Sequence, residues 1–426
     1  MAKPLSRRAS LALLAGAAAL PLIPDARASS PLPWRPLIPA TPAPDGSIPG
    51  WRRLGGHAPY RLEKGEIIGT SVEKSRNSFL VSDELFDDFI LECQVKTDPR
   101  LNTGIMIRSE SKPDYRDGVV HGYQVEIDHA ARRWTGGIYD EQRRLWLATP
   151  AHRPDTQASF KSGDWNHIRV EAVGTRIRTW LNGLPAANVV DDMTPRGFFG
   201  LQVHDVGPDP ANAGLEVRFK DLRVITDDPG RYTRRPLDVT DEQDFIANHL
   251  TRERVALGWR LLWDGKGAGG WSGLSGRGWS IADGAIIREG AEGAIVSADR
   301  FGDFDLELDV QAVEGADGAV GYLGGAFYRL AQGSQGQGET ASGSLEGKVG
   351  ASNLTDPNPD KPSMKPAGHW NRVRILVQGD RVEHWLNGSK LVAGSRAGFG
   401  LPASGPVSLR PGAGRLSFRS IRIRPL

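Results

Sequence analysis

The chain contains two copies of one sequence pattern, and this repeat limits its fold more than any other feature. Gly-Asp-Trp-Asn-His-Ile-Arg at 163–169, followed by Trp-Leu-Asn-Gly at 180–183, matches Gly-His-Trp-Asn-Arg-Val-Arg at 368–374 and Trp-Leu-Asn-Gly at 385–388 without a gap. Phe-x-Asp-Phe-x-Leu-Glu also occurs twice, at 86–92 and 301–307. A shared spacing of this length indicates two tandem copies of one fold.

Each copy consists of short runs with a two-residue alternation of apolar and polar side chains. In the first copy these runs are residues 89–96, 103–108, 121–128, 165–172, 177–181, 199–204 and 215–225. The chain has 52 glycines and 29 prolines, which suit many turns, and each Leu-Asn-Gly triplet is typical of a tight hairpin. No long amphipathic helix interrupts the runs. The pattern therefore predicts an all-β protein with two tandem β-sandwich domains.

The ends of the two copies give the expected domain boundaries. Residues 51–226 form the first sandwich, which is the catalytic candidate, and residues 259–426 form the second, which we expect to be non-catalytic. Residues 227–258 are a linker with a short helix, because Thr240 and Gln243 resemble a helix capping box. Phe245, Ile246, His249 and Leu250 would share one face of that helix. Residues 29–50 are a proline-rich leader.

The first 28 residues have the pattern of an export signal. Arg7 and Arg8 precede an apolar run at 11–23, and Ala-Arg-Ala at 26–28 suits a cleavage site. The segment resembles a twin-arginine signal, with the general secretory route as the alternative. We therefore expect a periplasmic or secreted protein. The apolar run is too short for a membrane span, so none is expected.

Charge and cysteine content exclude other classes. The net charge is +2, far from the excess of a nucleic-acid-binding protein, so no nucleic-acid partner is expected. Cys93 is the only cysteine, so no internal disulfide can form, and its place on the apolar side of a predicted strand indicates a buried structural thiol.

Residues 121–128, His-Gly-Tyr-Gln-Val-Glu-Ile-Asp, are the best candidate for a site. Tyr123, Val125 and Ile127 would point into the core, and Gln124, Glu126 and Asp128 would point the other way. Carboxylates spaced along one face repel one another unless a ligand or a cation lies among them. The alternative is a strand whose polar face simply meets water.

The two copies keep the same core and turn residues but differ on this polar face. Gln202 and His204, which end a strand of the first copy, align with Arg410 and Gly412 in the second. The strand equivalent to 122–128 is 325–330, where Arg329 stands in place of an acid. We therefore expect the chemistry in the first sandwich.

Side chains on the same predicted face suit a neutral sugar, because amides and Arg pair with hydroxyls, an aromatic ring stacks on the sugar, and an acid or imidazole moves protons. For His204 alone, a structural histidine is the alternative. The candidate set is Glu92, Gln94, Met106, Arg108, Gln124, Glu126, Asp128, Gln202 and His204, with Tyr139, Asp140, Arg144 and Trp146 on a nearby loop or short strand.

Several motifs resemble the 3-keto-disaccharide hydrolase family, which has a concanavalin-like jelly-roll fold. They are Gly-Tyr-Gln-Val-Glu-Ile-Asp at 122–128, Gly-Gly-Ile-Tyr-Asp-Glu at 136–141, Asp-Trp-Asn at 164–166 and Leu-Gln-Val-His at 201–204. The second copy is similar through Leu-Trp-Asp-Gly at 262–265 and His-Trp-Leu-Asn-Gly at 384–388, but it lacks the acidic strand. The resemblance implies cleavage of glycosides that a partner oxidoreductase has already oxidised at C3.

The expected catalytic residues are Glu126, Asp128, His204 and Tyr139. Glu126 or His204 would act as base or acid, and Asp128 would assist them or bind a metal. The substrate-binding set is Arg108, Gln124, Asp140, Arg144, Trp146 and Gln202. No cofactor is assigned, although Glu126, Asp128 and His204 could hold a divalent metal ion or work without one.

Two other functions remain open at the level of sequence. A conventional retaining glucanase with this fold carries Glu-x-Asp-x-x-Glu on one strand, but Ala131 stands where the second glutamate would be. A lectin-like protein that binds carbohydrate without catalysis is the other alternative.

Overall fold

The computed structural model describes residues 32–234, 242–290, 293–333, 341–346 and 364–426. The export signal expected at 1–28 and Thr240 of the expected capping box lie outside these residues. The described part is almost entirely β, as predicted, with two short α-helices, α1 (Pro154–Ser159) and α2 (Arg252–Ala256). No helix in the described part is long and apolar enough to cross a membrane.

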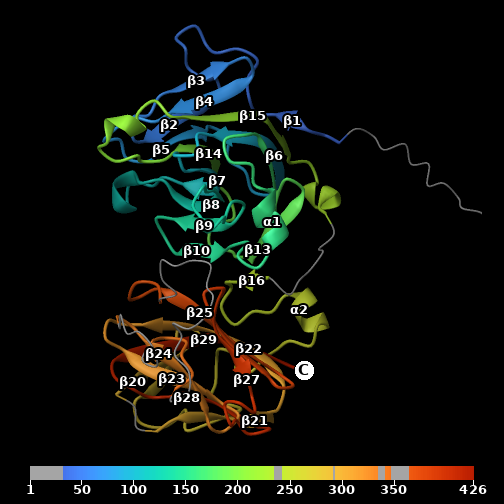
Figure 1. The fold of residues 1–426 in the computed structure, drawn as a ribbon, viewed down its shortest axis with the longest axis vertical. Helices are drawn as coiled ribbons and strands as arrows, with labels where there is room; N and C mark the ends of the chain where they lie inside the picture. The colour runs from blue at the N-terminus through green and yellow to red at the C-terminus, as the bar shows by residue number, and fades with distance from the viewer. Residues whose placement is uncertain (1–31, 235–241, 291–292, 334–340, 347–363) are drawn as a thin grey trace, which may run out of the picture. The chain divides into compact units, whose positions relative to one another are not determined.

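The first sandwich consists of two sheets (Figure 1). The larger contains, in spatial order, β16 (Gln243–Asp244), β13 (Leu184–Val190), β12 (Arg176–Leu181), β11 (Asn166–Val173), β6 (Phe89–Thr97), β15 (Glu216–Ile225), β4 (Glu66–Thr70) and β3 (Tyr60–Glu63), with β1 (Arg35–Pro36) on β15. The smaller contains β10 (Leu145–Ala148), β9 (Ile138–Glu141), β8 (His121–Ile127), β7 (Thr103–Glu110), β14 (Phe198–Val203), β5 (Ser78–Ser82) and β2 (Trp51–Gly55).

The second sandwich repeats this strand order. Its larger sheet contains β19 (Trp279–Ala282), β20 (Ala285–Glu289), β29 (Arg415–Pro425), β22 (Phe304–Ala312), β25 (Trp370–Gln378), β26 (Arg381–Leu386) and β27 (Ser389–Ser395), with β17 (Arg260–Leu261) on β29. Its smaller sheet contains β18 (Trp271–Ser272), β21 (Ile295–Phe301), β28 (Gly405–Arg410), β23 (Asp317–Tyr322) and β24 (Ala326–Ala331). The sequence repeat is therefore a structural repeat.

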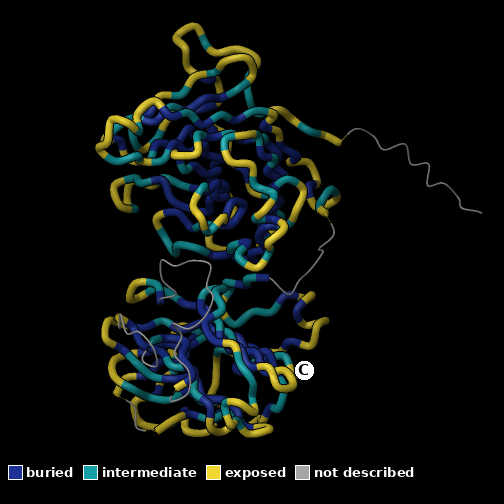
Figure 2. Tube along the Cα trace, viewed as in Figure 1, coloured by how far each residue is buried: buried dark blue, intermediate teal, exposed yellow. Residues whose placement is uncertain are grey.

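A separate hydrophobic core fills the space between the two sheets of each sandwich (Figure 2). In the first, Leu91 and Val95 of the larger sheet pack with Ile105 and Val125 of the smaller, because alternate side chains of each strand point inward. Cys93 belongs to this core, and burial raises the pKa of its thiol, which fits a structural role.

The hairpins at the two Asn-Gly pairs are the turns that the sequence predicts. Asn182 and Gly183 have φ angles of 48° and 88°, and Asn387 and Gly388 have 49° and 86°. Positive φ at both central residues belongs to the turn whose twist matches that of antiparallel strands, and Asn and Gly tolerate it best.

The linker differs from the expectation. Residues 245–250 are not helical, and Gln243 lies in β16, which pairs with β13. The helix α2 begins later, at Arg252, where the Thr251 hydroxyl accepts a hydrogen bond from the backbone N–H of Arg254. The leader also differs, because β1 pairs with β15 and so joins the first sandwich.

Candidate functional site

The outer face of the smaller sheet in the first sandwich carries most of the predicted site. Tyr123, Val125 and Ile127 of β8 belong to the core, so Gln124 and Glu126 point to the opposite side. The Gln124 amide donates a hydrogen bond of 2.8 Å to the amide oxygen of Gln202 on β14. It reaches across β7 because Gly104 lies beneath it, where a Cβ atom would collide with the Gln124 side chain.

Glu126 is the most perturbed acid on this face. Its side chain is buried, and its Oε1 atom accepts a 2.7 Å hydrogen bond from Nδ2 of Asn102. Burial raises the pKa of Glu126 to about 8, and the nearby negative charges of Asp128 and Glu141 act in the same direction against Asn102 and Arg132. A pKa in this range suits a group that donates a proton near neutral pH.

Glu141 is a second acid on this face that the sequence analysis did not include. It is buried, burial raises its pKa, and it interacts electrostatically with Glu126 and His204. Nδ2 of Asn77 donates a 3.2 Å hydrogen bond to it. The alternation along β9 could have identified Glu141, because it lies two residues beyond Tyr139 and therefore on the same face of the sheet. No sequence pattern indicated that Asn77 would contact this face, since it comes from a distant segment.

His204 follows β14 and is only half-buried. Its Nδ1 atom lies 2.7 Å from the backbone oxygen of Asp205. A carbonyl oxygen only accepts hydrogen bonds, so Nδ1 carries the hydrogen and Nε2 of the neutral ring has the lone pair. His204 can therefore take a proton through Nε2.

Aromatic rings form a second part of the site next to the acids. Trp146 of β10 makes edge contacts with Tyr139, at 5.2 Å between ring centroids, and with Trp134, at 5.0 Å. The guanidinium of Arg132 lies 5.2 Å from the ring centroids of both tryptophans. Burial raises the pKa of Tyr139 to about 12, with Glu141 and Glu126 adding to the effect, so its hydroxyl stays a neutral donor.

Asp128, expected to assist the catalytic residues, is held by the loop that follows β8. Its Oδ1 atom accepts a 2.8 Å hydrogen bond from the backbone of Ala130, and Oδ2 accepts one of 2.5 Å from Nε of Arg132. Thr135 bonds its backbone from the other side of the turn. Asp128 therefore shapes the loop that carries Arg132 and Trp134, and it adds negative charge near Glu126.

Arg108 does not join this face, contrary to the prediction. The pairing of β7 with β8 shifts after Ile107, and Arg108 has a φ angle of 44°, so the alternation of side chains breaks there. Its guanidinium is buried and donates to the backbone oxygens of Asp87 and Gly174 and to the carboxylate of Asp88. These contacts give Arg108 a structural role.

Asp140 and Arg144 also lie elsewhere. Asp140 pairs with Tyr123 in the register of β9 and β8, on the core side of the sheet. Arg144 bonds Asp140 at 2.5 Å and Asp191 at 2.6 Å, and the Tyr123 hydroxyl donates to Asp191 at 2.7 Å. This buried ion cluster faces away from Glu126.

Three further residues predicted on this face do not belong to its polar part. Glu92 and Gln94 are in β6 of the larger sheet, where Glu92 binds Arg169 and Arg223. Met106 does lie on the outer face, but in an apolar cluster with Phe79, Val81, Val120 and Phe198. The polar part of the face is therefore smaller than the sequence predicts.

The described residues do not fit a metal centre. Nowhere among them do three His, Cys, Asp or Glu side chains gather closely enough to hold a metal ion. Both carboxylate oxygens of Asp128, one of the three possible ligands, accept hydrogen bonds from Ala130 and Arg132. We therefore assign no step to a metal.

The sheet register shows what the second sandwich has in place of this site. Glu126 pairs with Gly104, and the equivalent pair in β24 and β23 is Arg329 with Ala319. Likewise Leu409 on β28 takes the place of Leu201, which puts Arg410 in the position of Gln202. Basic residues thus replace both the acid and the amide.

A family model described as a 3-keto-alpha-glucoside-1,2-lyase-like domain matches residues 34–225 and 258–424. No curated protein matches the sequence. Among solved structures, a candidate glycosyl hydrolase from Parabacteroides distasonis is similar at 22% identity and a TM-score of 0.36, covering 42% of this chain and 99% of that one. A carbohydrate-binding module from Bacillus subtilis is similar at 18% identity and 0.29, covering 41% and 93%.

Proposed function

Because the chain belongs to the 3-keto-alpha-glucoside-1,2-lyase-like domain family through both of its sandwiches, we propose that the first sandwich cleaves glycosidic bonds in sugars that carry a ketone at C3. The single observation that carries the proposal is Glu126, a buried acid that keeps its proton at neutral pH and lies on a polar face with Tyr139 and a second acid, Glu141.

The reaction follows from the acidity of a carbon next to a ketone. A base removes the hydrogen at C2, and the electron pair of that C–H bond forms an enolate with C3. The enolate then collapses, a double bond forms between C1 and C2, and the bond from C1 to the leaving oxygen breaks. That oxygen takes a proton from an acid. Addition of water across the double bond would complete a net hydrolysis.

The residues supply the three groups that this path needs. Glu126 delivers its proton to the leaving oxygen, since it is protonated at neutral pH. Nε2 of His204 takes the proton from C2, because Nδ1 is committed to the Asp205 carbonyl. Tyr139 donates its hydroxyl hydrogen to the enolate oxygen, a stabilisation that acts mainly in the transition state.

Binding of the sugar ring would use the rest of the face. Trp146, with Trp134 beside it, offers an aromatic surface, and the linked amides of Gln124 and Gln202 offer donors and acceptors for ring hydroxyls. Arg132, a half-buried basic side chain, lies over both tryptophans and also holds Asp128 in place.

The proposal implies a partner reaction and a location. A ketone at C3 must be made from an alcohol, so an oxidoreductase acting on the C3 hydroxyl would supply the substrate. The arginine pair and apolar run of residues 1–28 support a site of action outside the cytoplasm, in the periplasm or beyond.

A conventional glycosidase is the second candidate, and Glu141 is the observation that favours it. In the sequence, Ala131 stands where a glucanase would have the second catalytic glutamate. In the structure, Glu141 of the neighbouring strand β9 is a second carboxylate near Glu126. Such a mechanism needs one ionised and one protonated acid. The pKa values of both Glu126 and Glu141 are raised, which suits a proton donor better than an ionised nucleophile.

The test compares a methyl 3-keto-glucoside with its unoxidised parent. We expect cleavage of the keto substrate only, and a Glu126→Gln variant that is slower by about 10²–10⁴-fold. Glu346→Gln is the matched control, because Glu346 is an acid in a turn of the second sandwich, where it pairs with Arg410 on β28. Cleavage of the parent alone would make the protein a conventional glycosidase. Binding of either sugar without cleavage would make it a lectin.

A further inference from the structure

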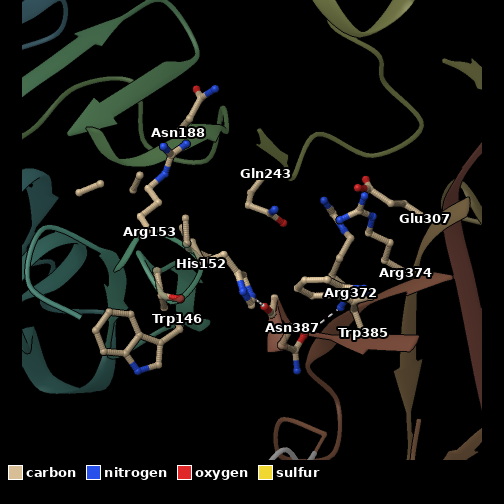
Figure 3. Close-up of a pocket in the computed structure, with 16 residues that line it drawn as sticks. Trp146, His152, Arg153, Asn188, Gln243, Glu307, Arg372, Arg374, Trp385 and Asn387 are labelled. Carbon is tan, nitrogen blue, oxygen red and sulfur yellow. Dashed lines mark hydrogen bonds between the residues drawn. The ribbon is translucent and has the colours of Figure 1, made fainter. Parts of the chain in front are cut away.

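A cavity of about 130 Å³ lies within residues 34–426 and is lined by residues of both sandwiches, including Trp146 at the border of the smaller sheet (Figure 3). We call it the Trp385 pocket and define it by His152, Asn188, Gln243, Arg372, Arg374 and Trp385. One water molecule needs roughly 10–15 Å³ of such space, so the pocket has room for a ligand of roughly ten non-hydrogen atoms. That is about the size of one sugar ring.

Arg372 is the strongest sign that the pocket receives a ligand. Its side chain is only 6% exposed, yet it lines the cavity. Nε donates to Asp309 at 2.6 Å and Nη2 to the backbone oxygen of Asp244 at 2.5 Å, while Nη1 is buried and bonds no protein atom. A buried guanidinium nitrogen without an acceptor costs free energy, so an acceptor oxygen in the pocket would satisfy it.

The charge around the pocket favours an anion. Arg374, Arg372 and Arg153 are cationic, and Glu307 is the acid among the lining residues. The Glu307 carboxylate already bonds Nη1 of Arg254 at 2.7 Å and lies 3.5 Å from Arg422, which hold its pKa at about 2. Its charge is therefore neutralised from outside the pocket. Arg374 pairs with Asp305 and Arg372 with Asp309, so the donor that remains for a ligand carboxylate is Nη1 of Arg372.

The ring of Trp385 makes the pocket suited to a sugar and not only to an anion. Its indole is half-buried, with His152 against its edge at 4.6 Å between ring centroids and Arg374 at 5.4 Å. Figure 3 shows the amide side chains of Gln243 and Asn188 on the opposite side of the cavity. An aromatic surface opposite amides is a common way to hold a ring that bears hydroxyls.

The first sandwich has closed the equivalent position. Trp180 matches Trp385 in the repeat, but it is only 4% exposed, whereas Trp385 is half-buried. Cationic groups lie over both rings. The aromatic wall of the pocket thus comes from the second copy, and His152 and Asn188 of the first copy complete the lining.

We propose that the Trp385 pocket binds a small acidic sugar, with the carboxylate at Nη1 of Arg372 and the ring against Trp385. The choice of a sugar rests on the proposed function, whereas the choice of an anion rests on Arg372 alone. The pocket is a second saccharide site, separate from Glu126. It would hold an acidic unit of a longer substrate or an acidic product.

The test measures binding of D-glucuronate, D-glucose and inorganic phosphate to the full chain by isothermal titration calorimetry. Glucuronate should bind at least tenfold more tightly than either of the others. Trp385→Ala should weaken glucuronate binding at least tenfold. Trp165→Ala is the control, because Trp165 is the repeat equivalent of Trp370, packs against Lys220 in the first sandwich and does not line the pocket. Equal binding of glucose or phosphate, or no effect of Trp385→Ala, would overturn the proposal.

Two further variants keep the test decisive. Arg372→Met should also abolish the preference for glucuronate. Because Arg372 also pairs with Asp309, the melting temperature of this variant must be measured to show that it still folds. If it does not fold, Gln243→Leu should weaken glucuronate binding several-fold, and unchanged binding there contradicts the proposal. Glu126→Gln should bind glucuronate as the unaltered chain does. If the chain binds glucuronate selectively but does not cleave 3-keto sugars, the proposed binding site is supported and only the proposed catalytic function is wrong.

Discussion

Glu126 and Arg329 occupy the same position in the two sandwiches. Glu126 lies on β8, inside its sheet, and Arg329 on β24, at the edge of its sheet, and each pairs with a small residue, Gly104 for Glu126 and Ala319 for Arg329. One copy therefore holds a protonated acid where the other holds a cation. The fold tolerates both because the position faces outward from the core.

The raised pKa of Glu126 should appear as a pH dependence of stability. The folded chain keeps the Glu126 proton up to about pH 8, whereas the unfolded chain loses it near 4.5. The free energy of unfolding should therefore fall as the pH rises through this window. The contribution is on the order of a few kcal/mol. Urea unfolding at pH 5 and pH 8 should show a smaller loss for Glu126→Gln than for the unaltered chain. Equal losses would show that Glu126 ionises normally.

Asn102 should set the alkaline limit of activity. Its hydrogen bond stabilises the ionised form of Glu126, so Asn102→Ala should raise the Glu126 pKa further. We expect the alkaline limb of kcat/KM to move up by about one pH unit. Asn77→Ala is the control, because Asn77 bonds Glu141 instead. A shift in the control alone would make Glu141 the proton donor.

Tyr139→Phe should separate a role in chemistry from one in packing. The variant keeps the ring that contacts Trp146 and loses only the hydroxyl. We expect kcat to fall roughly 10- to 100-fold with KM and the melting temperature little changed. Tyr232→Phe, in a short helical turn at Pro229–Tyr232, should change none of these. A normal kcat for Tyr139→Phe would remove Tyr139 from the mechanism.

Arg144→Met tests whether Arg144 binds substrate or stabilises the fold. Removing its charge leaves the buried carboxylates of Asp140 and Asp191 without their shared partner. We expect a loss of about 3–5 kcal/mol in the free energy of unfolding. Arg100→Met, at an exposed pair with Asp98, should cost less than about 1 kcal/mol. The specific activity of folded Arg144→Met should equal that of the unaltered chain. A large rise in KM for this variant would instead show that Arg144 binds substrate.

Sequence periodicity predicted the strands well because a buried strand repeats its apolar residues every two positions. All seven runs expected in the first copy are strands, and β8 has the predicted inward and outward faces. Periodicity failed at Arg108, where a shift of register turned the side chain away. Such a shift leaves no mark on composition.

The site was only partly predictable for a related reason. Gln124 and Gln202 lie 78 positions apart and meet because Gly104 leaves room between their strands. The outward face could be deduced for each strand separately, but not which outward side chains touch. Asn77 illustrates the limit, since it bonds Glu141 from a segment 64 positions away in the sequence.

Lys365 of the second sandwich donates hydrogen bonds to the backbone oxygens of Arg144 and Trp146. These carbonyls are two residues apart, so they point outward from β10, the last strand of its sheet. An uncovered border of this kind recruits strands from other molecules. A first sandwich produced without the second would leave the edge of β10 uncovered. It should therefore self-associate even though its own core is complete.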